Sequence, residues 1–275
     1  TGITLIAVGS LVVGVAMVFF PAIAHPYMKK VTGSDDVAIG HFSTLSYVLA
    51  GFIGSKFGNK VHSTEDMNVP KSLLFLRDTP VAISFTMSII FLLTCLFAGA
   101  DAVKELSGGK NWFMFSIMQS ITFAAGVYII LQGVRMVIAE IVPAFKGISD
   151  KLVPNARPAL DCPVIFPYAP NAVLVGFLSS FAAGLIGMFT LYLLNMIVII
   201  PGVVPHFFVG AAAWAFGNAT GGRRGAILGA FAQGLLITFL PVFLLPVLGD
   251  IGFANTTFSD ADFGALGILL GIIVR

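Results

Sequence analysis

Charged residues are scarce in this chain, and their scarcity excludes most classes of protein. Asp, Glu, Lys and Arg make up 10% of the 275 residues, against roughly 25% in an average soluble domain. So few charges cannot cover a water-facing surface, and they exclude disordered and nucleic-acid-binding proteins. The hydrophobic share of 57% therefore indicates an all-α membrane protein with several transmembrane helices.

Cysteine and catalytic motifs are scarce as well. The two cysteines, Cys95 and Cys162, lie in apolar or proline-rich runs, which argues against a disulfide framework. The sequence has no G-x-S-x-G, H-E-x-x-H, Walker A or C-x-x-C motif, and its four histidines lack metal-ligand spacing. We therefore expect neither an enzyme nor a bound metal or cofactor.

Gaps between charged residues mark the expected membrane spans. About 20 apolar residues of helix cross a bilayer core. Spans are expected at 3–25, 80–99, 112–133 and 225–247, with a helix at 171–199, a shorter one near 206–217 and an incomplete span at 263–274. Because Thr1 already lies inside an apolar run, we expect a fragment of a longer protein.

Two further apolar segments are unsuited to plain spans. Residues 37–55 contain His41 and several hydroxyl groups, and residues 158–172 contain four prolines and Asp161. Non-helical backbone at membrane depth is tolerated only where protein or a water-filled cavity satisfies it. We expect re-entrant hairpins or broken helices; the alternatives are a plain short span for 37–55 and an external loop for 158–172.

Basic residues indicate the sidedness. They gather at Lys29 and Lys30, in 56–78, in 134–157 and at Arg223 and Arg224, so this side should be cytoplasmic. Residues 56–78 are expected to be a soluble connection with a short helix after Pro70. Residues 134–157 have the charge spacing of a helix end followed by a helix that lies flat in the membrane interface. The loop 250–262 holds only acidic charges and should lie outside.

Polar groups at membrane depth are candidates for a functional site because they are costly unless partnered. Asp161, among prolines, is suited to accept hydrogen bonds from substrate hydroxyls, and it also fits the N-cap of a helix beginning near Pro163. His41 is suited to donate to an anionic or polyhydroxylated ligand, with the hydroxyls of Ser43 and Thr44 nearby. Alternatively, His41 is a satisfied polar residue without a ligand.

Several runs resemble one transporter family. These are GHFSTLSYVLAGFIG, VPKSLLFLRDTPVAIS, LQGVRMVIAEIVPAFKGISDKLVPNARPALDCPVIFPYAPNAV, IIPGVVPHFF and FSDADFGALGILLG. Together they are similar to the ascorbate-specific membrane component, EIIC, of the bacterial phosphotransferase system. The resemblance covers essentially the whole chain.

The resemblance implies an inverted-repeat transporter fold and a homodimer in the bacterial cytoplasmic membrane. The substrate would be ascorbate, and phosphoryl transfer would come from the phosphocysteine of a partner, EIIB, which EIIA supplies. It also implies that the chain is one partial membrane domain, 1–275, without its N-terminal part. Within it, 1–55 would be the remainder of the first repeat, 56–78 a cytoplasmic connection and 79–275 the second repeat.

The substrate site follows partly from the resemblance. His41 and Asp161 match the family's binding residues, and Phe42 stands where some relatives have Gln. The expected substrate-binding residues are His41, Phe42, Ser43, Asp161, Cys162 and Pro163. Two alternatives remain: an ion-coupled secondary transporter for a small organic anion, in which Asp161 would hold the coupling ion, or a membrane scaffold without transport.

Overall fold

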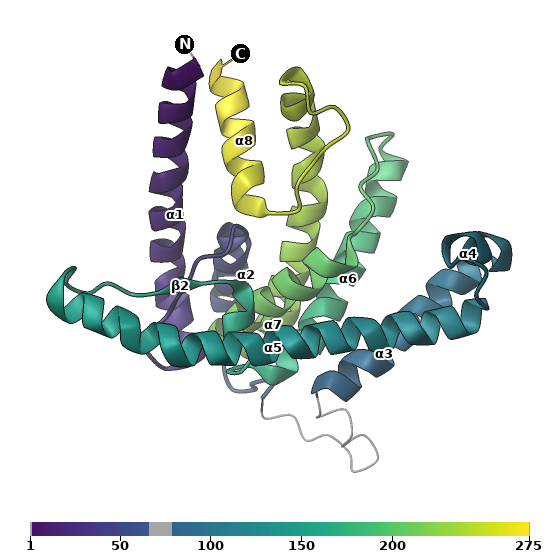
Figure 1. The fold of residues 1–275 in the computed structure, drawn as a ribbon, viewed down its shortest axis with the longest axis horizontal. Helices are drawn as coiled ribbons and strands as arrows, with labels where there is room; N and C mark the ends of the chain where they lie inside the picture. The colour runs from purple at the N-terminus through teal and green to yellow at the C-terminus, as the bar shows by residue number, and fades with distance from the viewer. Residues whose placement is uncertain (1, 66–78, 275) are drawn as a thin grey trace. The chain divides into compact units, whose positions relative to one another are not determined.

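The computed structural model describes residues 2–65 and 79–274, almost entirely as helices (Figure 1). The elements are α1 (Gly2–Thr32), β1 (Ala38–Ile39), α2 (Thr44–Phe57), α3 (Thr79–Ala98), α4 (Ala100–Leu106), α5 (Trp112–Lys151), β2 (Ala159–Leu160), the 3₁₀ helix η2 (Cys162–Ile165), α6 (Pro170–Leu193), α7 (Val203–Asp250) and α8 (Ala261–Val274). The short helix expected after Pro70 lies outside the described residues.

The helices are long and apolar enough for several membrane crossings. Within the described residues, α1, α5, α6 and α7 each contain a segment that could span a bilayer. The pair α3 and α4, bent by 111°, would make a fifth span if counted together. The prediction of an all-α, multi-pass membrane protein is therefore confirmed.

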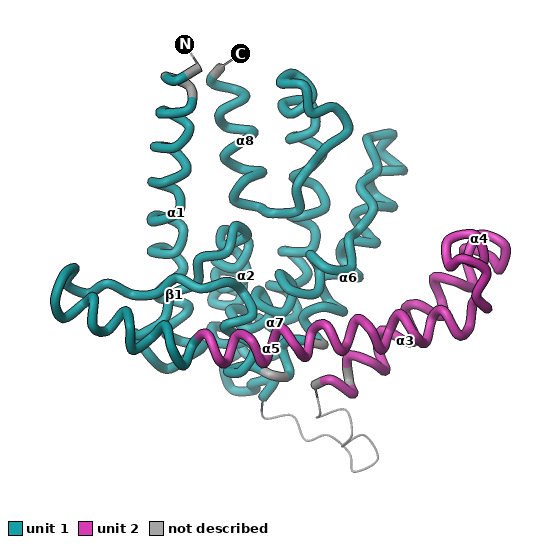
Figure 2. The backbone as a smooth tube through the Cα atoms, in the orientation of Figure 1, with its two compact units in different colours: residues 1–66, 138–275 teal, residues 67–137 magenta. Residues whose placement is uncertain are grey.

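The chain folds into two compact units (Figure 2). Unit 1 comprises residues 1–66 and 138–275, and unit 2 comprises residues 67–137. In unit 2 the helices α3 and α5 are tied by a hydrogen bond of 2.8 Å between the hydroxyls of Ser88 and Ser120. All the residues expected to bind substrate lie in unit 1.

The core of unit 1 is α7, against which α2 and α6 pack at close range. Glycines make this approach possible: a Cβ at Gly54 would lie 2.6 Å from the carbonyl oxygen of Gly217, and one at Gly176 would lie 2.6 Å from that of Gly210. Small residues at helix contacts let backbones approach where lipid offers no hydrophobic driving force.

Polar groups reinforce the contact of α6 with α7. The buried hydroxyl of Ser180 donates to Gln233 Oε1 at 2.7 Å and lies 2.7 Å from Nδ1 of His206. Interhelical hydrogen bonds of this kind are worth about 1 kcal/mol in membranes. The helix that follows Asp161 is thus fixed to the core of unit 1.

The long helix α7 is broken at Gly221 and Gly222, where the backbone leaves helical geometry and Gly222 has a φ of 59°. At the break, the N–H of Arg223 donates to the carbonyl of His62 at 2.7 Å. The sequence predicts separate helices at 206–217 and 225–247. They are present, but the residues between them are helical except at this glycine pair.

Helix α5 also differs from expectation. A span at 112–133 followed by a separate flat helix was predicted, whereas one helix of 40 residues runs to Lys151 with Pro143 inside it. Its part in unit 1 lies beside the connection from α1 to β1, since Val142 and Pro143 line one cavity with Thr32 and Val37.

The two segments predicted to be broken are indeed non-helical where they begin. β1 and β2 pair in parallel, with the N–H of Ala38 donating to Pro158 at 2.9 Å and that of Gly40 to Leu160 at 2.8 Å. A 14-residue helix, α2, follows β1, while β2 leads into η2 and then α6. The ladder therefore brings the two segments side by side just before His41 and Asp161.

Candidate functional site

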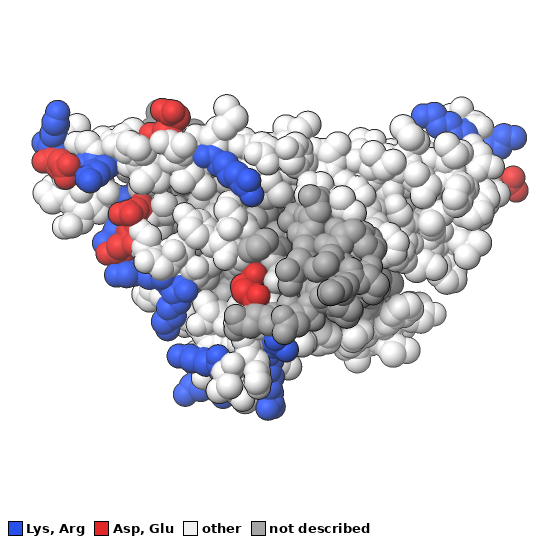
Figure 3. All heavy atoms as spheres, turned by 90° about the horizontal axis from the view of Figure 1, so that it is seen from below, with Lys and Arg blue, Asp and Glu red and all other residues white. Residues whose placement is uncertain are grey.

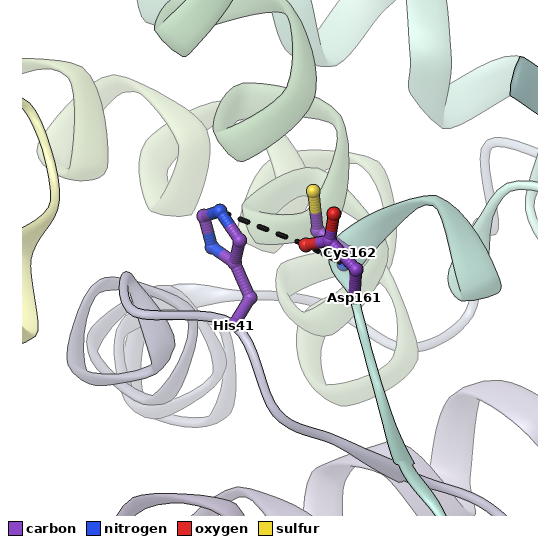
Figure 4. A group of neighbouring side chains, drawn as sticks. All are labelled: His41, Asp161 and Cys162. Atoms are coloured by element: carbon purple, nitrogen blue, oxygen red, sulfur yellow. Dashed lines mark hydrogen bonds and ion pairs between the residues drawn. The ribbon is translucent and has the colours of Figure 1, made fainter. Parts of the chain in front are cut away.

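The two strands position the candidate residues. Gly40 allows the close approach, because a Cβ there would lie 3.0 Å from the Cβ of Ala159. His41 then leaves the end of β1 and Asp161 leaves the end of β2. Figure 4 shows the imidazole and the carboxylate turned toward one another, with His41 Nε2 3.8 Å from Asp161 Oδ1.

Asp161 caps the short helix that follows it. Its Oδ1 accepts the backbone N–H of Cys162 at 2.7 Å, and Pro163 stands where the first turn needs no N–H. Yet 70% of the side chain is exposed, so the carboxylate keeps acceptor capacity for a ligand. Capping and ligand binding are compatible here.

His41 is held by contacts to one ring nitrogen. Nδ1 lies 3.2 Å from the backbone N–H of Ser43, which can only donate, and 2.6 Å from the hydroxyl of Tyr47. Nδ1 therefore acts as an acceptor, and the proton of the neutral ring belongs on Nε2. The ring is thus set to donate toward the side of Asp161.

The start of α8 forms the other wall of the site. Asp260 Oδ1 also lies 3.8 Å from His41 Nε2 and accepts the Ser43 hydroxyl at 3.3 Å. Asp262, which is buried, accepts the N–H groups of Thr44 at 3.0 Å and Leu45 at 2.8 Å. A carboxylate at the first turn of α2 satisfies helix donors that would otherwise be unpaired.

The other predicted residues make contacts within the protein. Phe42 stacks on Phe263 with ring centroids 4.2 Å apart, and its carbonyl accepts the N–H of Asp262 at 2.9 Å. The Ser43 hydroxyl accepts the N–H of Ala261 at 3.2 Å. Cys162 and Pro163 are buried beneath Asp161. These four residues shape the turns that carry His41 and Asp161.

Sequence reasoning missed Tyr47, Asp260 and Asp262. The two acids were assigned to an external loop because 250–262 carries only negative charge. Their place immediately before an apolar run was a usable signal, since acidic residues favour the first turn of a helix. Tyr47 gave no comparable signal, because a tyrosine among apolar residues is usually a packing residue.

Three side chains of the cluster could in principle hold a metal ion. One ligand atom each from His41, Asp161 and Cys162 lies within 4.8 Å of the others. However, Asp161 Oδ1 already accepts the N–H of Cys162, and the thiol is buried. We therefore assign no metal to these residues.

These features are typical of polytopic membrane transporters. Discontinuous segments that meet at polar side chains, among helices long enough to span a bilayer, are how many transporters build a substrate site. The family model described as "PTS system sugar-specific permease component", EIIC-GAT, matches residues 1–262. The chain belongs to this family of phosphotransferase-system permease components.

The chain is also similar to one curated protein of this kind. The chain is 29% identical over 265 residues to the "Ascorbate-specific PTS system EIIC component" of Mycoplasma pneumoniae (strain ATCC 29342 / M129 / Subtype 1). The match covers 85% of this chain and 38% of the relative, so the chain spans well under half of the relative's length. The resemblance drawn from the sequence is confirmed.

Proposed function

We propose that the protein containing this chain is a permease that binds ascorbate or a close sugar acid and moves it inward. The main support is the placement of His41 and Asp161, which come from distant segments, with Nε2 and Oδ1 3.8 Å apart. Both residues match the family's binding residues in the resemblance described above. A donor facing an acceptor suits a ligand that carries both an enolate oxygen and free hydroxyls. The ascorbate-specific relative supports the same substrate.

The role proposed for this chain in the reaction is to position the substrate. A substrate hydroxyl attacks the phosphocysteine of a separate EIIB protein, which EIIA recharges, so this chain need not supply a nucleophile. Holding the hydroxyl in line converts a bimolecular encounter into an oriented one, and such orientation contributes several kcal/mol to phosphoryl transfer. His41 would hold an acceptor oxygen of the ligand, and Asp161 a hydroxyl.

The proposed cytoplasmic side is the end of unit 1 where α1 and α2 finish. Tyr27, near Lys29 and Lys30, packs on Phe216, and the α7 break that precedes Arg223 lies against the chain after α2. Figure 3 looks onto this face, where Lys and Arg side chains lie along the edge, with fewer Asp and Glu side chains among them. Such an excess of basic residues favours the cytoplasmic side of a bacterial inner membrane. A homodimer is part of the proposal.

The proposed function is tested by uptake of labelled ascorbate. The full-length protein is expressed in cells that lack their own ascorbate permease, with and without EIIB. We expect uptake only with EIIB and phosphoenolpyruvate, and a phosphorylated product inside the cell. Uptake of unmodified ascorbate that follows an ion gradient would instead support the secondary transporter.

A further inference from the structure

The site contains a second carboxylate in a position equivalent to that of Asp161. Oδ1 of Asp260 and Oδ1 of Asp161 are each 3.8 Å from Nε2 of His41, and they approach it from different segments. The two side chains are 36% and 70% exposed. Both carboxylates are therefore accessible to a molecule that enters the site.

The spacing leaves room for ligand atoms. A hydrogen bond from N–H to oxygen spans about 2.7–3.2 Å, so neither carboxylate accepts directly from Nε2 at 3.8 Å. A hydroxyl oxygen placed beside the ring accepts from Nε2–H and donates its own proton to a carboxylate. With two carboxylates at this distance from the same ring nitrogen, the arrangement fits a ligand that has more than one hydroxyl.

Asp260 is held in place for this task. Its Oδ1 accepts the Ser43 hydroxyl, which in turn accepts the N–H of Ala261, so the turn before α8 is tied to the His41 turn. Asp262 strengthens the same connection by capping α2. A carboxylate fixed by its own backbone turn loses little side-chain entropy when a ligand binds.

We propose that Asp260 is a substrate-contacting residue that determines specificity: it accepts a hydrogen bond from a ligand hydroxyl other than the one that Asp161 holds. Together the two carboxylates restrict the site to polyhydroxylated ligands that carry at most one negative charge, because a second anionic group would face two like charges. This inference rests on the proposed function, since it concerns how the same site selects its ligand.

The test is equilibrium binding of labelled ascorbate to the purified full-length protein. Asp260→Asn should lower the affinity about 10- to 150-fold, the effect of losing one charge-assisted hydrogen bond. Asp150→Asn, which changes an exposed acid on α5, is the matched control and should bind as the wild type does. Thermal unfolding of each variant checks the fold, and Asp260→Ser replaces Asp260→Asn if the latter is unstable.

Deoxy analogues identify the contact itself. If Asp260 accepts from one side-chain hydroxyl, one of the two analogues, 5-deoxy- or 6-deoxyascorbate, should bind the wild type more weakly than ascorbate does. The Asp260→Asn variant should bind that analogue and ascorbate with equal affinity. Fully additive losses, or wild-type affinity of the folded variants, would overturn the role of Asp260. A wild-type protein that binds no ascorbate would reject the proposed substrate instead. The comparison is then repeated with sorbitol, and failure to bind either ligand would overturn both proposals.

Discussion

Arg157 and Asp35 form an ion pair of 2.7 Å that joins the two chain segments just before they become β1 and β2. Asp35 also lies 2.6 Å from His25 Nε2 and 3.1 Å from Lys29 Nζ, both on α1. The group is therefore a junction of three segments at the base of the strand pair. Because His41 and Asp161 leave the other end of that pair, the junction helps to set their relative position.

This junction should make stability depend on pH. The hydrogen bond from His25, followed by that from Lys29, holds the pKa of Asp35 below its usual value. A carboxyl group with a lowered folded-state pKa contributes stability above its unfolded pKa of about 3.9 and loses it as the pH falls through the folded value. Asp35→Asn should therefore lower the unfolding temperature of the full-length protein near pH 7, but not in strong acid.

The measurement is a series of thermal unfolding curves at decreasing pH for the wild type, Asp35→Asn and the control Asp150→Asn. The difference between wild type and Asp35→Asn should shrink to zero below the lowered pKa. A difference that stays constant across the whole range would show that the charge of Asp35 contributes nothing.

Asp161→Asn should severely reduce ascorbate uptake while the protein still inserts into the membrane. The amide keeps an oxygen to cap Cys162, so the local turn survives. The lost charge-assisted hydrogen bond to the ligand is worth about 1.5–3 kcal/mol, or about 10- to 150-fold in affinity. Binding and uptake are measured beside the level of inserted protein. Normal uptake by well-inserted Asp161→Asn would remove this residue from the proposed site.

Tyr47→Phe should weaken ligand binding by way of His41. The phenol is fully buried, packs against Phe216 and has its hydroxyl 2.6 Å from Nδ1 of His41. Phenylalanine keeps the packing but frees the ring to turn, which should cost about 2- to 10-fold in ascorbate affinity.

A titration of ascorbate binding checks this effect, with Tyr128→Phe on α5 as a control at an exposed tyrosine. Because Tyr47 acts through His41, the loss should largely disappear in a His41→Ala background. An equal loss in both backgrounds would show that Tyr47 affects binding independently of His41.

Much of this architecture was readable from the sequence because the bilayer constrains it strongly. Charge-free runs marked α1, α3 and α6, and the prolines and polar groups around His41 and Asp161 marked the two broken segments. The residues whose roles were not predicted are those whose roles depend on tertiary contacts. Nothing near Asp260 in sequence reveals that its turn returns to Ser43.

The helix boundaries show the same limit. Pro143 and Arg135 suggested that a span ends and a flat helix begins, yet α5 is continuous in the structure. The break in α7 at Gly221 and Gly222 falls between the two expected helices, but the contact of these glycines with α2 and the chain after it is not encoded in the local sequence. Local sequence patterns therefore predicted the positions of the helices better than their boundaries and the contacts at those boundaries.

Gly54→Ala should impair folding of the α2–α7 contact. A Cβ at residue 54 would lie 2.6 Å from the carbonyl oxygen of Gly217, a backbone atom that cannot move aside freely. Overpacking of this kind typically costs about 1–3 kcal/mol. Gly14→Ala on α1 is the matched control, since nothing lies within 4 Å of its added Cβ.

Both variants are assessed by the yield of inserted protein and by thermal unfolding. Only Gly54→Ala should lower them; an unfolding temperature equal to that of the wild type would show that α2 and α7 can separate at little cost.

The last prediction concerns which side of the membrane each end of unit 1 faces. The distribution of basic residues predicts that the basic end, with Lys56 and Arg223, is cytoplasmic and that the loop 250–262 lies outside. The structure qualifies the second part, because Asp260 and Asp262 return to the His41 turn and only the first part of that loop is fully exposed. Lys60 and Ala254 are exposed positions that separate the two ends.

Single cysteines at these positions, Lys60→Cys and Ala254→Cys, can be labelled with a membrane-impermeant thiol reagent in intact cells and in inside-out vesicles. The native Cys95 and Cys162 are buried and should give little background, which the unmodified protein measures. We expect Ala254→Cys to react in intact cells and Lys60→Cys only in inside-out vesicles. Labelling in the opposite sense would reverse the topology and would move the proposed EIIB-facing surface away from the basic end, because the phosphorylated partner is available only in the cytoplasm.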